Sequence, residues 1–330
     1  MNLLFVVHRY GWPGGSEYYT AAMAEESLRR GHNVAVFAGE HKGDQNGIRV
    51  TNDPNILLLK WDLIIVHGCD TNNAQDFVLQ NAKNIPSSIL YMIILPSNSQ
   101  TALNALEHCL YLGWSTSDDI NYLHEHNVGH KAVRVRHSIN HNESLGKPGF
   151  KNNHNITSKM FLSCGGYWQN KKMKELALLF LKADIPDTVL VTTGYDNRFN
   201  LMPNNVPDKI INLLIDDKSE VLSAISEADC YLMHSSQEGF GLVILESMLN
   251  KTPWIARHIA GPAMLKNFGK TYHTDDELIL LLQNFNRDDF DLDSSHQYII
   301  DNHLIANTIN DIENVAATDI INKRQARFKV

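Results

Sequence analysis

Two glutamates, Glu238 and Glu246, lie on either side of a glycine-rich turn and are the residues best placed for chemistry. The apolar run at 228–233 predicts a buried strand that ends where polar residues begin. The order strand, loop, helix places Glu238 in the loop and Glu246 about two turns further along. Gly239 and Gly241 let the backbone approach a ligand, and the free N–H groups of the helix start favour an anion. This arrangement suits a long ligand with a sugar at one end, a diphosphate over the helix end and a ribose beyond it.

The segment 234–246, with the predicted strand at 253–256 and the predicted turn at Gly261-Pro262, resembles the E-x7-E signature of GT4-type retaining glycosyltransferases, the "glycosyl transferases group 1" family. The resemblance implies the GT-B fold, an α/β architecture of two Rossmann-like domains with parallel sheets and a donor site in the cleft between them. An ordinary capped helix with two solvated glutamates is the simpler alternative. It would account for the helix but not for the glycines on both sides of Phe240.

The resemblance also implies an activity, and a role for each residue of the motif. The enzyme would be a metal-independent, hexosyltransferase-like glycosyltransferase that needs no cofactor beyond its nucleoside-diphosphate sugar substrate. Glu238 would hold hydroxyls of the transferred sugar, and Glu246 would hold the ribose hydroxyls. Phe240, Gly241 and Leu242 would present backbone N–H groups to the sugar and the phosphate. Catalysis would consist of positioning and of electrostatic stabilisation of the leaving diphosphate, which would help to deprotonate the acceptor hydroxyl.

A second donor segment follows the strand predicted at 159–163. Where the family has Gly-Arg and, several residues later, a lysine that reaches the phosphates, Gly165 matches the glycine and Lys172 matches the lysine. Gly166, however, stands in the arginine position. Loss of one cation would cost about 3 kcal/mol of transition-state stabilisation, because negative charge grows on the leaving diphosphate. Lys171, or backbone N–H groups at Gly165 and Gly166, could compensate.

The first half of the chain begins with a strand predicted at 3–8, a glycine-rich loop at 9–16 and a helix over 17–30. Gly14 and Gly15 resemble the glycine pair that opens the first helix in GT4 enzymes, which would let backbone N–H groups approach the donor diphosphate. A dinucleotide-binding dehydrogenase also has a glycine-rich turn at this point. The G-x-G-x-x-G spacing is missing, which disfavours the dehydrogenase.

A histidine, His67, closes the predicted strand at 61–67 and matches a family position, so we predict a catalytic role for it. A strand-end histidine is more often structural, and that interpretation stays open. The family usually carries another strand-end histidine, which faces the transferred sugar. The corresponding strand here, predicted at 90–95, ends in Pro96 instead.

The domain organisation follows from length and from one polar stretch. A chain of 330 residues is about twice a typical domain, and its hydrophobic content of 43% is enough for two cores. The stretch at 141–153 contains Gly and Pro and lacks an apolar period, which predicts a boundary. We expect an acceptor-side domain over 1–145, a donor-side domain over 155–295 and a helical segment over 296–330, for which packing back on the first domain is one arrangement.

Charge and cysteine content restrict the partners and the compartment. A net charge of −8 disfavours a nucleic-acid binder, which would need a basic face. Local basic runs lie at 130–136 and 323–329; a solvated surface is the favoured interpretation, and contact with an anionic membrane or glycan is the alternative. The four cysteines form no C-x-x-C, and no apolar segment reaches bilayer length. We expect a cytoplasmic protein, with peripheral membrane contact as an alternative, whose partners are a nucleotide sugar and a glycan or lipid-linked acceptor.

Three other functional classes share some of these sequence features. The D-x-D patterns at 289–293 would hold a metal in a GT-A glycosyltransferase, but their context predicts an acidic loop, and the histidines at 124–130 lack H-E-x-x-H spacing; we therefore predict no metal site. A glycoside hydrolase would need two carboxylates that face each other across the bond. A non-catalytic member that binds a sugar nucleotide or glycan stays open because of Gly166 and Pro96.

Overall fold

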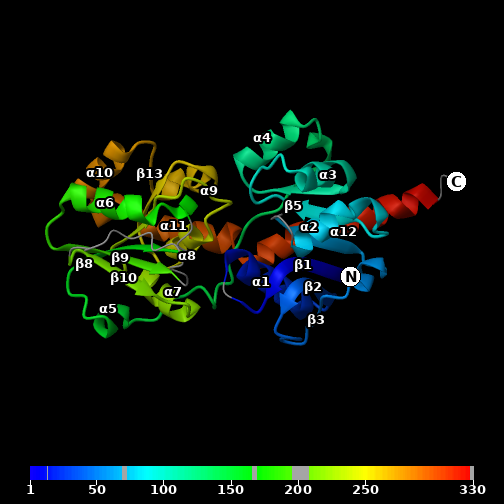
Figure 1. Ribbon diagram of the computed structural model, residues 1–330, viewed down its shortest axis with the longest axis horizontal. Coiled ribbons are helices and arrows are strands. Elements are labelled where there is room, and N and C mark those ends of the chain that lie inside the picture. The colour runs from blue at the N-terminus through cyan, green and yellow to red at the C-terminus, as the bar shows by residue number, and fades with distance from the viewer. Residues whose placement is uncertain (13, 69–72, 166–168, 195–207, 328–330) are drawn as a thin grey trace. The chain divides into compact units, whose positions relative to one another are not determined.

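The computed structural model describes residues 1–12, 14–68, 73–165, 169–194 and 208–327 (Figure 1). The chain divides into two compact units, Met1–Ser138 with His303–Val330, and Ile139–Asn302. The sequence placed its divisions at 145–155 and at 295/296. The second unit begins earlier because Gly146 donates a backbone hydrogen bond to the Asn250 side chain (2.8 Å), which in turn donates to the Ser144 carbonyl (2.7 Å).

The first unit is built on a seven-stranded sheet in the order β3-β2-β1-β4-β5-β6-β7, in which all pairs are parallel. The strands are β1 (Asn2–Tyr10), β2 (Asn33–His41), β3 (Arg49–Thr51), β4 (Leu63–His67), β5 (Ile89–Met92), β6 (Tyr111–Trp114) and β7 (Ala132–Arg134). The helices are α1 (Gly15–Arg29), α2 (Ala74–Gln80), α3 (Gln100–His108), α4 (Ser117–Glu125) and α12 (Ile305–Arg327), with 3-10 turns η1 (Pro54–Leu58), η2 (Ala82–Asn84) and η3 (Gly129–Lys131). The central strand β4 is buried along its whole length, as expected where helices cover both faces of a parallel sheet.

The second unit holds a six-stranded parallel sheet in the order β10-β9-β8-β11-β12-β13. Its strands are β8 (Lys159–Cys164), β9 (Thr188–Gly194), β10 (Ile210–Leu214), β11 (Cys230–Met233), β12 (Trp254–Arg257) and β13 (Lys270–Tyr272). Its helices are α5 (Phe150–Asn153), α6 (Met173–Ala183), α7 (Lys218–Glu227), α8 (Leu242–Leu249), α9 (Ala260–Met264), α10 (Asp275–Gln283) and α11 (Leu292–Asn302), with turns η4 (Gln169–Lys171), η5 (Lys266–Phe268) and η6 (Arg287–Asp289). The predicted α/β class with two Rossmann-like domains is confirmed.

Two local predictions were wrong. Gly261 and Pro262 lie inside helix α9 and not in a turn, because proline in a first helical turn loses no hydrogen bond. A Cβ on Gly261 would lie 1.8 Å from the Phe240 carbonyl oxygen, so only glycine fits there. The strand predicted at 90–95 ends at Met92, which leaves Pro96 in the following loop.

The cysteine and membrane predictions can be compared with the described residues. Cys109, Cys164 and Cys230 are buried free thiols, whereas Cys69 lies outside the described residues. Over the described part of the chain, no helix has both the length and the apolar character of a membrane span.

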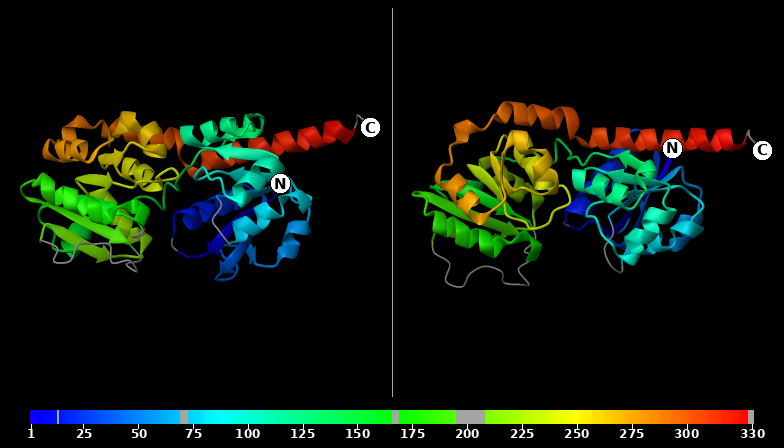
Figure 2. Two further views of the ribbon diagram at one scale, coloured as in Figure 1. Left: turned by 45° about the horizontal axis from the view of Figure 1, so that its top comes forward. Right: turned by 90° about the horizontal axis from the view of Figure 1, so that it is seen from above.

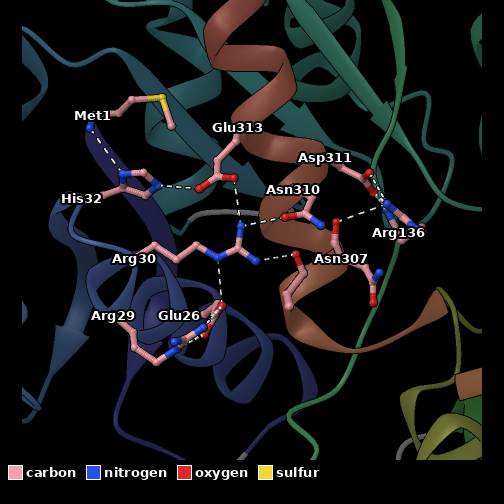
Figure 3. A network of polar contacts seen from close by, with 11 residues as sticks. Met1, Glu26, Arg29, Arg30, His32, Arg136, Asn307, Asn310, Asp311 and Glu313 are labelled. Atoms are coloured by element: carbon pink, nitrogen blue, oxygen red, sulfur yellow. Dashed lines mark hydrogen bonds and ion pairs between the residues drawn. The ribbon is translucent and has the colours of Figure 1, made fainter. Parts of the chain in front are cut away.

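Helix α12 lies along the first unit and is attached to it by polar contacts (Figures 2 and 3). Arg30, at the end of α1, donates to Asn310 Oδ1 (2.7 Å), Glu313 Oε2 (2.9 Å) and the Ala306 carbonyl (2.9 Å). The apolar side of the helix is also buried, for example at Ile309. The last helix of the chain is therefore part of the first unit's core.

A second clasp on α12 joins Arg136 to Asp311 (Figure 3). The Arg136 guanidinium donates Nη2 to Asp311 Oδ1 (2.6 Å) and Nε to Asp311 Oδ2 (2.8 Å), and the Arg136 backbone N–H also donates to Oδ2 (3.0 Å). Both side chains are mostly buried, at 24% and 13% exposure. This geometry is bidentate, which distinguishes it from an ordinary surface ion pair.

We expect Asp311→Ala to lower the free energy of unfolding by about 1–2 kcal/mol, because Arg136 loses its bidentate partner. Urea unfolding followed by circular dichroism measures the change. Asn314→Ala, an exposed position on the same helix, is the control and should leave stability unchanged. Equal midpoints for the Asp311 variant and the wild type would contradict this role.

Candidate functional site

The order of strands in the second sheet identifies where a ligand would bind. From β8 the chain proceeds outward to β9 and β10, and it then returns to β11 on the other side of β8. Open parallel sheets bind ligands beyond the carboxyl ends of the strands at such a reversal. The residues that follow β8 and β11 include Gly165 and Glu238, so two predicted site segments lie at this point of the sheet.

Glu238 lies in the loop after β11 and is held from two sides. Its Oε1 is 2.5 Å from Lys171 Nζ and accepts a hydrogen bond from Ser235 Oγ (2.7 Å). The Ser236 backbone N–H donates to the Asn170 carbonyl (2.7 Å), which fastens the Glu238 loop to turn η4. The Glu238 side chain is only 11% exposed. Because Lys171 pairs with it, its charge is compensated before any ligand binds.

Helix α8 begins directly after this loop. Its N-cap, Gly241, has a φ of 83°, in the left-handed region that favours glycine. The N–H groups of Leu242 and Val243 have no acceptor within the helix and carry the positive end of its dipole. Phe240 is buried, and its carbonyl packs closely against Gly261. The predicted phosphate-facing backbone therefore begins at a helix terminus whose position is fixed by close packing.

Glu246 lies in α8, about one turn from the helix start, because the helix begins at Leu242. Its side chain is 13% exposed, and its nearest cation is Lys218, with Nζ to Oε1 at 3.8 Å. Burial raises the pKa of the Glu246 carboxyl, and Lys218 opposes that shift. Burial also raises the pKa of Tyr231, with further contributions from Cys164, Glu238 and Glu246.

The two adjacent lysines point to different partners. Lys171 reaches Glu238, and a Cβ on Gly165 would lie 3.7 Å from Lys171 Cε. Lys172 has a φ of 54° and pairs with Glu175, Nζ to Oε1 at 3.2 Å. The left-handed backbone at Lys172 separates the directions of the two side chains. The structure therefore brings Lys171 to the motif glutamate, whereas the sequence analysis predicted the larger role for Lys172. Gly166 lies outside the described residues.

Sequence reasoning missed a polar cluster beside this site. His234 follows β11 and is buried; Arg257 is the last residue of β12. Arg257 Nη2 is 3.1 Å from His234 Nε2 and 3.2 Å from Asp275 Oδ1. Burial, and then the Arg257 charge, lower the pKa of His234 to about 4. The sequence feature that could have indicated this cluster is the position of Arg257 at the carboxyl end of β12, the strand beside β11.

In the first unit the strand order reverses between β1 and β4. The loop after β1 contains Gly14, which has a φ of 157° and caps α1. A Cβ on Gly14 would meet only the carboxylate end of Glu17, which can move aside, so the positive φ and not the available space favours glycine here. Gly15, the first residue of α1, has open space around it. Of the predicted glycine pair, only Gly14 is required by the local geometry.

His67 is the last residue of β4 and is 4% exposed. Its Nε2 is 3.1 Å from His137 Nε2, and the Tyr19 ring packs on both imidazoles with centroid distances of 4.8 Å and 5.1 Å. His137 Nδ1 is 2.6 Å from Ser115 Oγ, which donates to Asp119 Oδ2 (3.4 Å). Burial lowers the pKa of both imidazoles, that of His137 to about 3. The catalytic role predicted for His67 stays a prediction.

The buried, neutral His137 makes stability depend on pH. Its folded pKa is depressed relative to the unfolded value of about 6.5, so the unfolded chain takes up a proton that the folded chain does not. Between pH 6 and pH 4, the free energy of unfolding should fall by about 1.4 kcal/mol per pH unit because of this residue. His137→Asn should decline less steeply over that range in urea titrations. The exposed His130→Asn is the control, and parallel slopes for all three proteins would refute the assignment.

The acidic and histidine-rich segments that could be read as metal sites have other contacts in the structure. Asp291 accepts hydrogen bonds from the Ser294 backbone at the start of α11, and Asp293 pairs with Lys251 (2.5 Å). The cluster at 124–130 spans the end of α4 and turn η3. Among the described residues, no group of three or more His, Cys, Asp or Glu side chains is arranged to hold a metal ion.

Comparison with known proteins agrees with this geometry. Residues 149–276 match the family model described as Glycosyl transferases group 1. No curated protein sequence matches the chain. The matched segment contains the loop of Glu238, helix α8 and both lysines.

Solved structures extend the likeness to the whole chain. WaaG, a glycosyltransferase involved in lipopolysaccharide biosynthesis, is 15% identical, with 95% of this chain and 98% of that chain covered and a TM-score of 0.70. Anabaena HepE, solved with UDP and glucose, is 14% identical, with 96% and 99% covered and a TM-score of 0.75. The trehalose-6-phosphate synthase OtsA is 12% identical, with 95% and 98% covered and a TM-score of 0.76. At these identities the likeness establishes the fold, which is GT-B.

Proposed function

We propose that the chain is a retaining glycosyltransferase that moves a sugar from a nucleoside-diphosphate sugar to a hydroxyl of a glycan or lipid-linked acceptor. The Lys171–Glu238 pair at the carboxyl ends of β8 and β11 carries this proposal. It combines a carboxylate for sugar hydroxyls and a cation for phosphate with the start of α8, all inside the group 1 segment. Anabaena HepE has the same fold and was solved with UDP-glucose, which supports a sugar nucleotide as donor.

In the proposed reaction Glu238 accepts hydrogen bonds from hydroxyls of the transferred sugar. Lys171 and the N–H groups at 240–242 meet the negative charge that grows on the diphosphate as the glycosidic bond breaks. The departing phosphate takes the proton of the acceptor hydroxyl. Lys171 is already paired in the free protein, so Glu238 is not left as an uncompensated charge before the donor binds. This scheme requires no metal ion.

Glu246 is proposed to bind the ribose. Two hydroxyls on adjacent ribose carbons can donate to the two oxygens of one carboxylate, which offsets the desolvation of a buried acid. Lys218 is its only neighbouring cation among the described residues and lies at ion-pair distance rather than hydrogen-bond distance. The carboxylate oxygens therefore keep acceptor capacity for a ligand.

The acceptor is proposed to bind to the first unit, with His67 as the predicted site residue there. Peripheral membrane contact is the weaker option. His130, Lys131 and Lys323 do line one groove. Lys131, however, donates to carbonyls at the end of α3, and Lys323 pairs with Asp319 (2.7 Å). Both lysines thus already have partners within the protein, which favours a structural surface over a membrane-binding one.

We expect Glu238→Gln and Lys171→Ala each to lower kcat/KM by on the order of 10²-fold, the scale for removal of one preorganised stabiliser. Initial rates of sugar transfer, or of slow donor hydrolysis, give the measurement. Lys174→Ala is the matched control, because Lys174 lies exposed on the neighbouring helix α6 and should leave the rate unchanged.

Two outcomes would overturn parts of the proposal. A wild-type protein that binds a sugar nucleotide but neither transfers nor hydrolyses it would be a binding module of the same fold. Loss of activity in EDTA, restored by Mn²⁺, would contradict the metal-independent scheme and direct attention to the acidic residues at 289–293.

Glu246→Gln should weaken binding of the free nucleoside diphosphate, about 10-fold, because the charged acceptor for the ribose hydroxyls is lost. Titration calorimetry with UDP, GDP and ADP measures it. The corresponding 2′,3′-dideoxynucleotide should bind the wild type and the variant equally. Unchanged affinity for the ribonucleotide in a folded Glu246 variant would rule out the ribose role.

A further inference from the structure

The Arg257 side chain has a hydrogen-bond donor without a partner among the described residues. It is the last residue of β12, next to β11 in the sheet, and its side chain is 26% exposed. Its Nη2 group contacts His234 and Asp275. Nε is buried and has no partner among the described residues. A buried N–H without a partner is costly, so the position is better explained by a ligand than by the surface pair with Asp275 alone.

The orientation of Arg257 is fixed by a hydrogen-bonded chain beneath it. The Tyr272 hydroxyl donates to the Met233 carbonyl (3.3 Å) and lies 2.6 Å from His234 Nδ1. Arginine can only donate, so His234 Nε2 must accept from it, and Nδ1 of the neutral ring then carries the proton and donates to Tyr272. The Tyr272 ring centre lies 5.7 Å from the Arg257 guanidinium carbon. A core tyrosine and a neutral histidine thus position the guanidinium.

Charges other than that of Arg257 also affect the pKa of His234. The charges that act on His234 are those of Arg257 and Lys172, which oppose its protonation, and those of Asp275 and Glu175, which favour it. Lys172 immediately follows Lys171, whose ammonium contacts Glu238. Arg257 contacts His234, the residue from which the Glu238 loop starts.

We propose that Arg257 forms a second cation site for the diphosphate of the donor. It would take the place of the arginine that the group 1 pattern has where this chain has Gly166. This inference rests on the proposed function, because it assigns a further residue to the same donor. A guanidinium suits the task, since its planar fork of donors matches phosphate oxygens and it stays charged at all working pH values. The exposed part of the guanidinium, on a side chain that is 26% exposed, is what a phosphate would contact.

The decisive experiment is titration calorimetry with UDP, GDP and ADP, followed by the nucleoside of whichever diphosphate binds the wild type. Arg257→Ala should weaken the diphosphate at least 10-fold and leave the nucleoside unchanged, because the nucleoside has no phosphate to lose. Arg257→Lys should recover part of the affinity, since it keeps the charge without the fork. Arg287→Ala is the matched control: Arg287 donates to the carbonyls of Asp229 and Lys251 in the same unit and should leave diphosphate affinity unchanged.

The outcomes separate this inference from the proposed function. A wild-type protein that binds none of the three diphosphates would refute the proposed function itself. If the wild type binds one of them and Arg257→Ala binds it equally well, the Arg257 site is wrong and the proposed function stands. Equal losses for diphosphate and nucleoside would show a structural role for Arg257 and would also overturn the site. Arg257→Gln, which keeps hydrogen bonding without charge, replaces the alanine variant if that variant fails to fold.

Discussion

The hydrogen-bonded ion pair between Lys171 and Glu238 is the interaction on which the proposed donor site depends. A carboxylate that is 11% exposed needs a partner, and the partner must come from another segment because the local loop has no cation. Turn η4 supplies it, and the loop is fastened to that turn by the Ser236–Asn170 hydrogen bond. The close packing of Gly261 on Phe240 then fixes where α8 starts. Carboxylate, cation and helix terminus are thereby placed together by contacts within one unit.

The motif residues could be predicted because their signal is local. A strand, a loop glutamate, a glycine with left-handed backbone and a helix glutamate follow one another in sequence, and each step has its own residue preference. The choice between Lys171 and Lys172 could not be predicted in this way. It depends on the backbone turn at Lys172, a non-glycine residue with a φ of 54°, which no local composition requires.

Contacts between distant segments explain the rest of what the sequence could not indicate. His67 is covered by Tyr19 from α1 and by His137 from the end of the first sheet, so its burial follows from the fold and not from the strand pattern. Arg257 is not part of a sequence motif. Its contacts with His234 and Asp275, which lie on other segments, are visible only in the structure. The packing of α12 on the first unit likewise depends on Arg30 and Arg136. The sequence around these two arginines does not indicate that contact.

The cations around the donor side share one electrostatic arrangement. Four cations each lie at ion-pair distance from one carboxylate, in the pairs Lys171–Glu238, Lys172–Glu175, Arg257–Asp275 and Lys218–Glu246. Each of these four positive charges is thus paired with a carboxylate in the free protein. An anionic ligand can replace a carboxylate only if it offers better geometry to several cations at once. A diphosphate meets that condition better than a single phosphate, because it carries more oxygens across a longer span, and this favours the intact donor over smaller anions.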